Sequence, residues 1–281
     1  MLNRIFTGIG LASFFLLLLL LGNGFIIGIL FSIIAIYGYY EWLAIQNNSM
    51  LNIYFFLSLA ILLMILLLRY HTHSIVLIFA YFSIFLWLMM CLDLLLKLNI
   101  YKKFLSISSS IVGLVFIVIT WFLFISLGST SNIEILEYSY LLFSHSELSD
   151  VNKYYLFLIG IVSLTDISGY FVGKTIGKNS LCPSISPKKT VEGFIGSLII
   201  PLIIFFILFN FVFSIPILIS DVIFMVLCCI FCTVGDLSVS VYKRFHNVKD
   251  SGNILPGHGG ILDRLDSYLP TISILHIWLF L

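Results

Sequence analysis

Long unbroken runs of apolar residues constrain this chain more than any other feature of its sequence. Residues 14–21 and 61–68 contain only Phe, Leu, Ile and Met. Transmembrane β-barrel strands alternate apolar and polar residues, so runs of this kind favour membrane-spanning helices. Charged residues make up 10% of the chain, against about 25% in soluble domains. This composition excludes a water-soluble globule, and the abundance of aromatic residues excludes a disordered chain.

The hydropathy pattern predicts an all-α, polytopic membrane protein with about nine transmembrane helices. The expected spans are 5–21, 25–40, 51–68, 74–96, 105–127, 154–172, 194–213, 217–235 and 267–281. With the N-terminus in the cytoplasm, twelve of the fourteen Lys and Arg residues fall on the cytoplasmic side. The excess of positive charge in cytoplasmic loops therefore favours this orientation.

The two halves of the chain differ in character. Residues 1–127 consist almost wholly of apolar spans, and we expect residues 1–150 to form a lipid-facing scaffold. Residues 151–281 hold most of the Gly, Pro, Lys and Asp residues in two polar segments on the cytoplasmic side. We therefore expect a C-terminal catalytic membrane domain with two active-site loops.

The polar segment from residue 235 to 266 carries the strongest chemical pattern. Four polar residues recur at i, i+4, i+7 and i+8 and would share one helix face; they are Asp236, Ser240, Lys243 and Arg244. Further along, the glycines beside His258 let backbone N–H groups approach an anion closely. Carboxylates with nearby phosphates are typical of Mg²⁺ sites, and Lys and Arg balance the phosphate charge.

The other polar segment runs from residue 166 to 196. Asp166 lies inside an apolar helix, where a charge costs about 2.5–3.5 kcal/mol, so we expect it to face a polar cavity. Ser186 would cap a helix whose first residue is Pro187. A helix N-terminus beside two lysines and a threonine suits a phosphate chain. The alternative is that both segments carry ordinary solvated charges, which leaves the costly Asp166 and the span-end Asp236 unexplained.

These residues resemble a known family. Residues 240–266 match the signature of the phosphatidate cytidylyltransferases with the correct spacing throughout, and residues 166–193 resemble the same family upstream. Family members commonly have an acidic residue at the position of Val239. We expect Val239→Glu to leave activity unchanged or to raise it modestly.

The resemblance implies a reaction and a set of site residues. Phosphatidate would attack the α-phosphorus of CTP, giving CDP-diacylglycerol and pyrophosphate. Mg²⁺ would be the cofactor, with a second, monovalent cation such as K⁺ left open. The implied metal ligands are Asp236, Asp263 and Asp266. The implied catalytic residues are Asp236, Asp263, Lys243, Arg244, Lys249, His258 and Arg264. The implied substrate-binding residues are Asp166, Ser186, Lys188, Lys189, Thr190, Ser240, Asp250, Gly259 and Gly260.

The implied surroundings follow from the substrates. The enzyme would lie in the cytoplasmic (inner) membrane with its active site on the cytoplasmic side, in contact with membrane lipid. A homodimer is implied by the resemblance, and no nucleic-acid partner is expected. Two alternatives remain open: a different CTP-using lipid enzyme, such as a lipid kinase, and an anion transporter.

Overall fold

The structure is a computed structural model, and it describes residues 24–46, 48–128, 150–212, 217–254 and 259–280. Within this part, seven helices are long and apolar enough to cross a membrane. They are α2 (Gly24–Ile45), α3 (Met50–Arg69), α4 (His73–Leu96), α5 (Ile100–Gly128), α7 (Asp150–Ile176), α8 (Val191–Ile207) and α9 (Ile219–Phe245). A π-helical turn, η2 (Leu208–Val212), extends α8. The predicted helical membrane protein is confirmed.

Two of the predicted spans stand apart from this set. The first, 5–21, lies outside the described residues. The last corresponds to α11 (Tyr268–Phe280), which has 13 residues and follows the short helix α10 (Leu262–Leu265). At 1.5 Å per residue α11 is about 20 Å long, shorter than the roughly 30 Å hydrocarbon core of a bilayer. The count of nine spans is therefore not confirmed.

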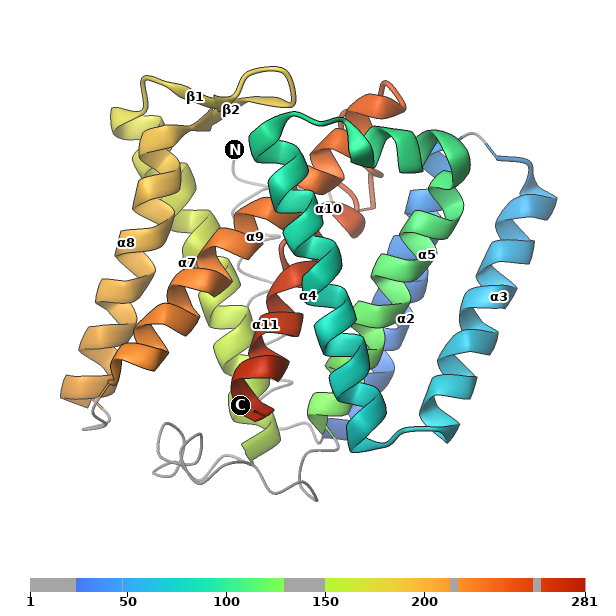
Figure 1. Ribbon diagram of the computed structural model, residues 1–281, viewed down its shortest axis with the longest axis horizontal. Coiled ribbons are helices and arrows are strands. Elements are labelled where there is room, and N and C mark those ends of the chain that lie inside the picture. Colours follow the sequence, from blue (N-terminus) through green and yellow to red (C-terminus); the bar gives the residue numbers. More distant parts are fainter. Residues whose placement is uncertain (1–23, 47, 129–149, 213–216, 255–258, 281) are drawn as a thin grey trace.

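The helices form one bundle in which α5, α9 and α11 are central and α3 and α8 are peripheral (Figure 1). In the most apolar part of α5, 72% of residues are buried, against 17% in α3. The peripheral helices expose Leu, Ile and Phe side chains, as helices in contact with lipid do. Backbone hydrogen bonds within each helix satisfy the polar groups that lipid cannot.

Residues 177–190 form a β-hairpin between α7 and α8. Strand β1 (Ser180–Cys182) pairs antiparallel with β2 (Ser186–Thr190), with Ser180 opposite Thr190 and Cys182 opposite Ser186. The prediction that Ser186 caps a helix is wrong, because Ser186 is paired within the hairpin. Thr190 caps α8 instead, accepting a hydrogen bond at 3.1 Å from the N–H of Gly193.

The two basic segments lie at the same end of the bundle. Figure 1 shows the β-hairpin, α10 and the C-terminal end of α9 together at its top. The turn between α4 and α5, which holds Lys97, is at this end too. The predicted boundary between an N-terminal scaffold and a catalytic domain, near residue 150, falls beside the undescribed segment 129–149 and stays a prediction. In the structure α11 packs against α4, α5 and α9.

The helix α5 is interrupted near this same end. Ser108 has non-helical backbone angles, and carbonyl groups just after it accept hydrogen bonds from α2. Tyr39 donates to the carbonyl of Ser110 at 3.0 Å, and Trp42 donates to that of Ser109 at 2.9 Å. The ring of Trp42 also stacks on Tyr242 of α9, with the ring centroids 3.7 Å apart. The C-terminal turns of α2 thus hold α5 and α9 together beneath the basic end.

Candidate active site

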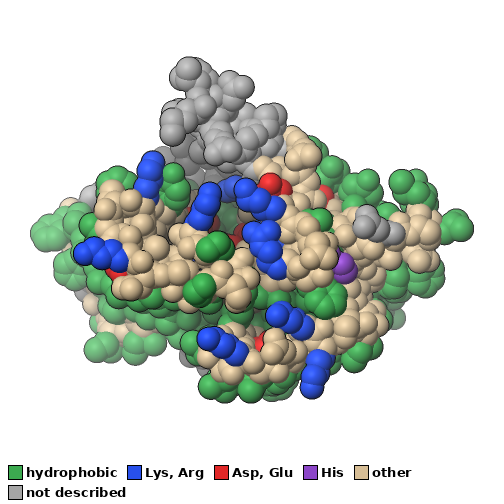
Figure 2. All heavy atoms as spheres, turned by 90° about the horizontal axis from the view of Figure 1, so that it is seen from above, with side chains coloured by type: hydrophobic (Ala, Val, Ile, Leu, Met, Phe, Trp, Pro, Cys, Tyr) green, Lys and Arg blue, Asp and Glu red, His purple; other side chains and the backbone are tan. Residues whose placement is uncertain are grey.

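Positive side chains surround a hollow at the basic end of the molecule. Figure 2 shows Lys and Arg gathered on this face, with acidic side chains visible inside the hollow. The exposed basic residues at this end are Lys97, Lys102, Lys103, Lys174, Lys178, Lys188, Arg244, Lys249 and Arg264. A rim of one sign raises the local concentration of an oppositely charged ligand, so this face favours anions.

Lys189 lies among three carboxylates within the hollow. Its Nζ is 2.5 Å from Oδ2 of Asp236, and the two side chains are each 28% exposed. Burial lowers the pKa of Lys189, but the charges of Asp236, Asp166 and Asp266 outweigh burial, so the net pKa is raised. Lys189 is therefore a protonated cation, held at the end of β2 and directed at α9.

The three carboxylates come from different parts of the chain. Asp236 lies on α9, where its Oδ1 accepts a hydrogen bond from Ser240 at 3.4 Å. Asp166 lies on α7 with an exposed side chain, and the thiol of Cys232 is 3.9 Å from its Oδ1. Asp266 follows α10 and is buried. Burial raises the pKa of Asp266 well above its ordinary value, and the charges of Asp236 and Asp166 raise it further.

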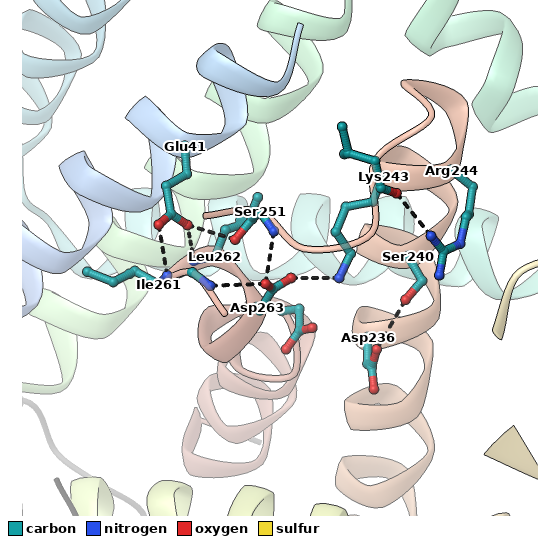
Figure 3. A network of polar contacts seen from close by, with 12 residues as sticks. Glu41, Asp236, Ser240, Lys243, Arg244, Ser251, Ile261, Leu262 and Asp263 are labelled. Atoms are coloured by element: carbon teal, nitrogen blue, oxygen red, sulfur yellow. Dashed lines mark hydrogen bonds and ion pairs between the residues drawn. The ribbon is translucent and has the colours of Figure 1, made fainter. Parts of the chain in front are cut away.

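Asp263 has a separate set of partners, shown in Figure 3. Its Oδ1 is 2.6 Å from Nζ of Lys243, and the two side chains are 9% and 11% exposed. Its Oδ2 accepts hydrogen bonds from the N–H groups of Ser251 at 2.9 Å and Gly260 at 3.1 Å. Burial raises the pKa of Asp263, but Lys243 and the two N–H groups outweigh burial and the net pKa is lowered. Both oxygens of Asp263 are therefore occupied by donors of the protein.

The fit of these carboxylates to a metal ion differs from residue to residue. Among the described residues, no group of three or more His, Cys, Asp and Glu side chains is arranged to hold a metal ion. Asp236 is nevertheless near enough for its charge to raise the pKa of Asp266, and carboxylate oxygens are the ligands that Mg²⁺ prefers. The donor chemistry of this pair fits a hard divalent cation. Asp263, bonded on both oxygens, fits that role less well.

The other predicted site residues occupy the rim and the loops. Arg244 donates to the carbonyls of Ile185 at 3.3 Å and Val248 at 3.0 Å, and so ties the β-hairpin to the end of α9. Gly259 has a φ of +82°, which favours glycine, and a Cβ there would lie 2.6 Å from Oδ2 of Asp263. The side chains of Lys188, Lys249, Asp250 and Arg264 are exposed. His258 lies outside the described residues.

One residue that contacts these loops was missed by the sequence reasoning. Glu41 lies on α2 and is 3% exposed. It accepts hydrogen bonds from Ser251, Ile261 and Leu262, which lie on both sides of residues 252–260, the glycine-rich segment (Figure 3). A sequence signal was present, because Glu41 is the sole charged residue in the apolar stretch from 5 to 68. A charge inside an apolar helix is as costly at Glu41 as at Asp166, so it indicates a polar role in the same way.

Comparison with known proteins gives a consistent result. The model of the cytidylyltransferase family matches residues 2–281. The phosphatidate cytidylyltransferase of Bacillus subtilis (strain 168) is 41% identical over 139 residues, which is 48% of this chain and 52% of that protein. The phosphatidate cytidylyltransferase of Staphylococcus haemolyticus (strain JCSC1435) is 40% identical over 138 residues, 49% of this chain and 53% of that protein. The chain thus spans about half the length of the curated relatives it matches.

Proposed function

Because the chain belongs to the cytidylyltransferase family, we propose that it transfers the cytidylyl group of CTP to phosphatidate, giving CDP-diacylglycerol and pyrophosphate. The relatives named phosphatidate cytidylyltransferase support this substrate pair. The observation that carries the proposal is the convergence of Asp236, Asp266 and Lys189 from three elements beneath a basic rim. Both proposed substrates are phosphate anions, so one positive hollow at the membrane surface suits both.

The reaction needs charge stabilisation and positioning more than proton transfer. A phosphate oxygen of the lipid attacks the α-phosphorus of CTP, and the bond from that phosphorus to the β-phosphate oxygen breaks, which releases pyrophosphate. The attacking phosphate is already an anion, so no strong general base is required. Lys189 and the exposed Lys188 and Arg264 supply positive charge that offsets the charge gathering on the pyrophosphate.

The carboxylates Asp236 and Asp266 would hold Mg²⁺ in this proposal. When bound, Mg²⁺ supplies a positive charge that polarises phosphate oxygens and stabilises the leaving group. Lys189 already neutralises part of the carboxylate charge, and it would turn towards phosphate when a metal takes that role. Asp263 as a third ligand, K⁺ as a second cation and a homodimer all stay predictions.

The membrane location follows from the apolar helices, and its sidedness is part of the proposal. We place the basic end in the cytoplasm, at the surface of the cytoplasmic (inner) membrane. Clustering of Lys and Arg at one end of the bundle supports this, because cytoplasmic loops carry the excess of positive charge. CTP would then reach the hollow from the cytoplasm and phosphatidate from the adjoining leaflet.

A single assay separates this proposal from its alternatives. Purified protein in detergent or liposomes receives CTP labelled in the cytidine, phosphatidate and Mg²⁺. The expected result is a labelled lipid product with equimolar pyrophosphate. Release of labelled CDP with a phosphorylated lipid would indicate a lipid kinase, and phosphate flux without nucleotide turnover would indicate a transporter. Lys189→Met is the matched inactive control, while Lys153→Met changes a lysine that lies in the first turn of α7, at the opposite end of the bundle.

A further inference from the structure

The carboxylates of Glu41 and Asp263 accept hydrogen bonds from residues at both ends of the glycine-rich segment. Three successive backbone N–H groups are involved. The N–H of Gly260 donates to Asp263, while those of Ile261 and Leu262 donate to Glu41 at 3.1 Å and 2.9 Å. At the other end of the segment, Ser251 donates its N–H to Asp263 and its hydroxyl to Glu41, the latter at 2.8 Å.

The donors that bind Glu41 have no alternative partner in their own helix. Leu262 is the first residue of α10 and Ile261 is its N-cap, and the N–H groups at the start of a helix lack intrahelical acceptors. Glu41 is buried, so water does not replace it. Each of its oxygens accepts from a backbone N–H, and an amide in its place would point an NH₂ group at one of these donors. The arrangement is therefore specific to a carboxylate.

Two glycines approach the carboxylate of Glu41 closely. A Cβ at Gly252 or Gly260 would overlap this carboxylate, so the two positions favour glycine as long as Glu41 keeps its place. Glu41 itself is fixed on α2 one residue before Trp42, which stacks on Tyr242. The next residue on α9, Lys243, forms the ion pair with Asp263. Glu41 on α2 thus sets the positions of Ser251, Ile261 and Leu262 relative to α9.

We propose that Glu41 is a positioning residue of the active site: it fixes Gly260–Leu262 and thereby the adjoining Asp263 and Asp266, without touching substrate. The inference rests on the proposed function for its activity readout. It assigns to α2 a part in turnover beyond that of a lipid-facing scaffold. Because a displacement of about 1 Å in a positioned group costs up to about 100-fold in rate, Glu41→Gln is expected to lower kcat by roughly 10- to 100-fold. The KM for phosphatidate should change little.

Two measurements test the role of Glu41, and the second does not depend on the proposed reaction. The first is kcat and the KM for phosphatidate in Glu41→Gln, Glu41→Asp and Ser251→Ala. The second is hydrogen–deuterium exchange of the peptide that contains Ile261 and Leu262, which needs no activity. The matched control is Asp93→Asn, since Asp93 also accepts two backbone N–H groups, from Ile100 and Tyr101, at a turn at the same end of the bundle.

The expected result is faster exchange at Ile261 and Leu262 in Glu41→Gln, with lower kcat and with the control unchanged in both. Wild-type kcat or unchanged exchange in Glu41→Gln would overturn the proposal. If Glu41→Gln does not fold, Ser251→Ala carries the test, because it removes one donor and keeps the carboxylate. It should then show faster exchange and a several-fold lower kcat, and full activity with normal exchange would overturn the proposal. A wild-type protein that forms no liponucleotide would refute the proposed function, while the exchange data would still decide the role of Glu41.

Discussion

The two lysine–aspartate pairs of the site differ in burial. Replacing the lysine by methionine in each pair should therefore lower stability by different amounts, although both replacements stop turnover. In the pair of Lys243 and Asp263 the side chains are 11% and 9% exposed, whereas in that of Lys189 and Asp236 each is 28% exposed. Removing one partner of a buried ion pair costs about 3–5 kcal/mol, because the other charge stays buried. More exposed pairs contribute about 0–1 kcal/mol.

Lys243→Met should therefore destabilise the protein by roughly 3 kcal/mol, since Asp263 keeps its two backbone N–H donors but loses its cation. Lys189→Met should destabilise the protein less than Lys243→Met does, because the pair of Lys189 and Asp236 is more exposed to solvent. Both variants should lose turnover. Unfolding of each variant in detergent, followed by tryptophan fluorescence, gives the free energies, and the CTP assay gives the rates. Equal destabilisation by the two substitutions, or a larger effect of Lys189→Met, would refute the reasoning from burial.

Three further substitutions extend the test. Asp263→Asn should abolish turnover while the protein still inserts into the membrane, as measured by membrane fractionation; near-normal turnover would contradict its place in the site. Thr190→Ala removes the cap of α8 and should cost about 1 kcal/mol in a melting experiment, with Thr190→Ser as the control that keeps the hydroxyl. The family pattern alone predicts that Val239→Glu leaves activity unchanged or raises it modestly. Val239 is 2% exposed, however, so the structure predicts less folded protein, measured as the yield after size-exclusion chromatography.

The sequence was sufficient to predict the helical membrane architecture and the juxtaposition of the two basic segments. Long apolar runs have one stable outcome in a bilayer, and the asymmetry of Lys and Arg places both segments on one side. The helix face that joins Asp236 to Ser240 followed from spacing alone. These features follow from the local sequence or from the order of the spans, and none of them depends on how side chains pack.

The sequence alone does not show which lysine of the site pairs with which aspartate. Lys189 and Asp236 are 47 positions apart, and Lys243 and Asp263 are 20 apart, so their contacts depend on the tertiary arrangement. The hairpin was missed because Ser186-Pro187 also resembles the beginning of a helix, and only strand pairing distinguishes the two. Glu41 lies outside both polar segments, although a lone carboxylate in an apolar span is as strong a sign of a polar role as Asp166 is.

The single residue between Lys189 and α8 has a mechanical consequence. Thr190 is both the last residue of β2 and the cap of α8, so no flexible linker separates the lysine from the helix. An axial displacement of α8 within the bilayer would therefore change the distance between the ammonium group of Lys189 and Asp236. Membrane thickness, which sets how deep such a helix sits, would then act directly on the charge balance at the reaction centre.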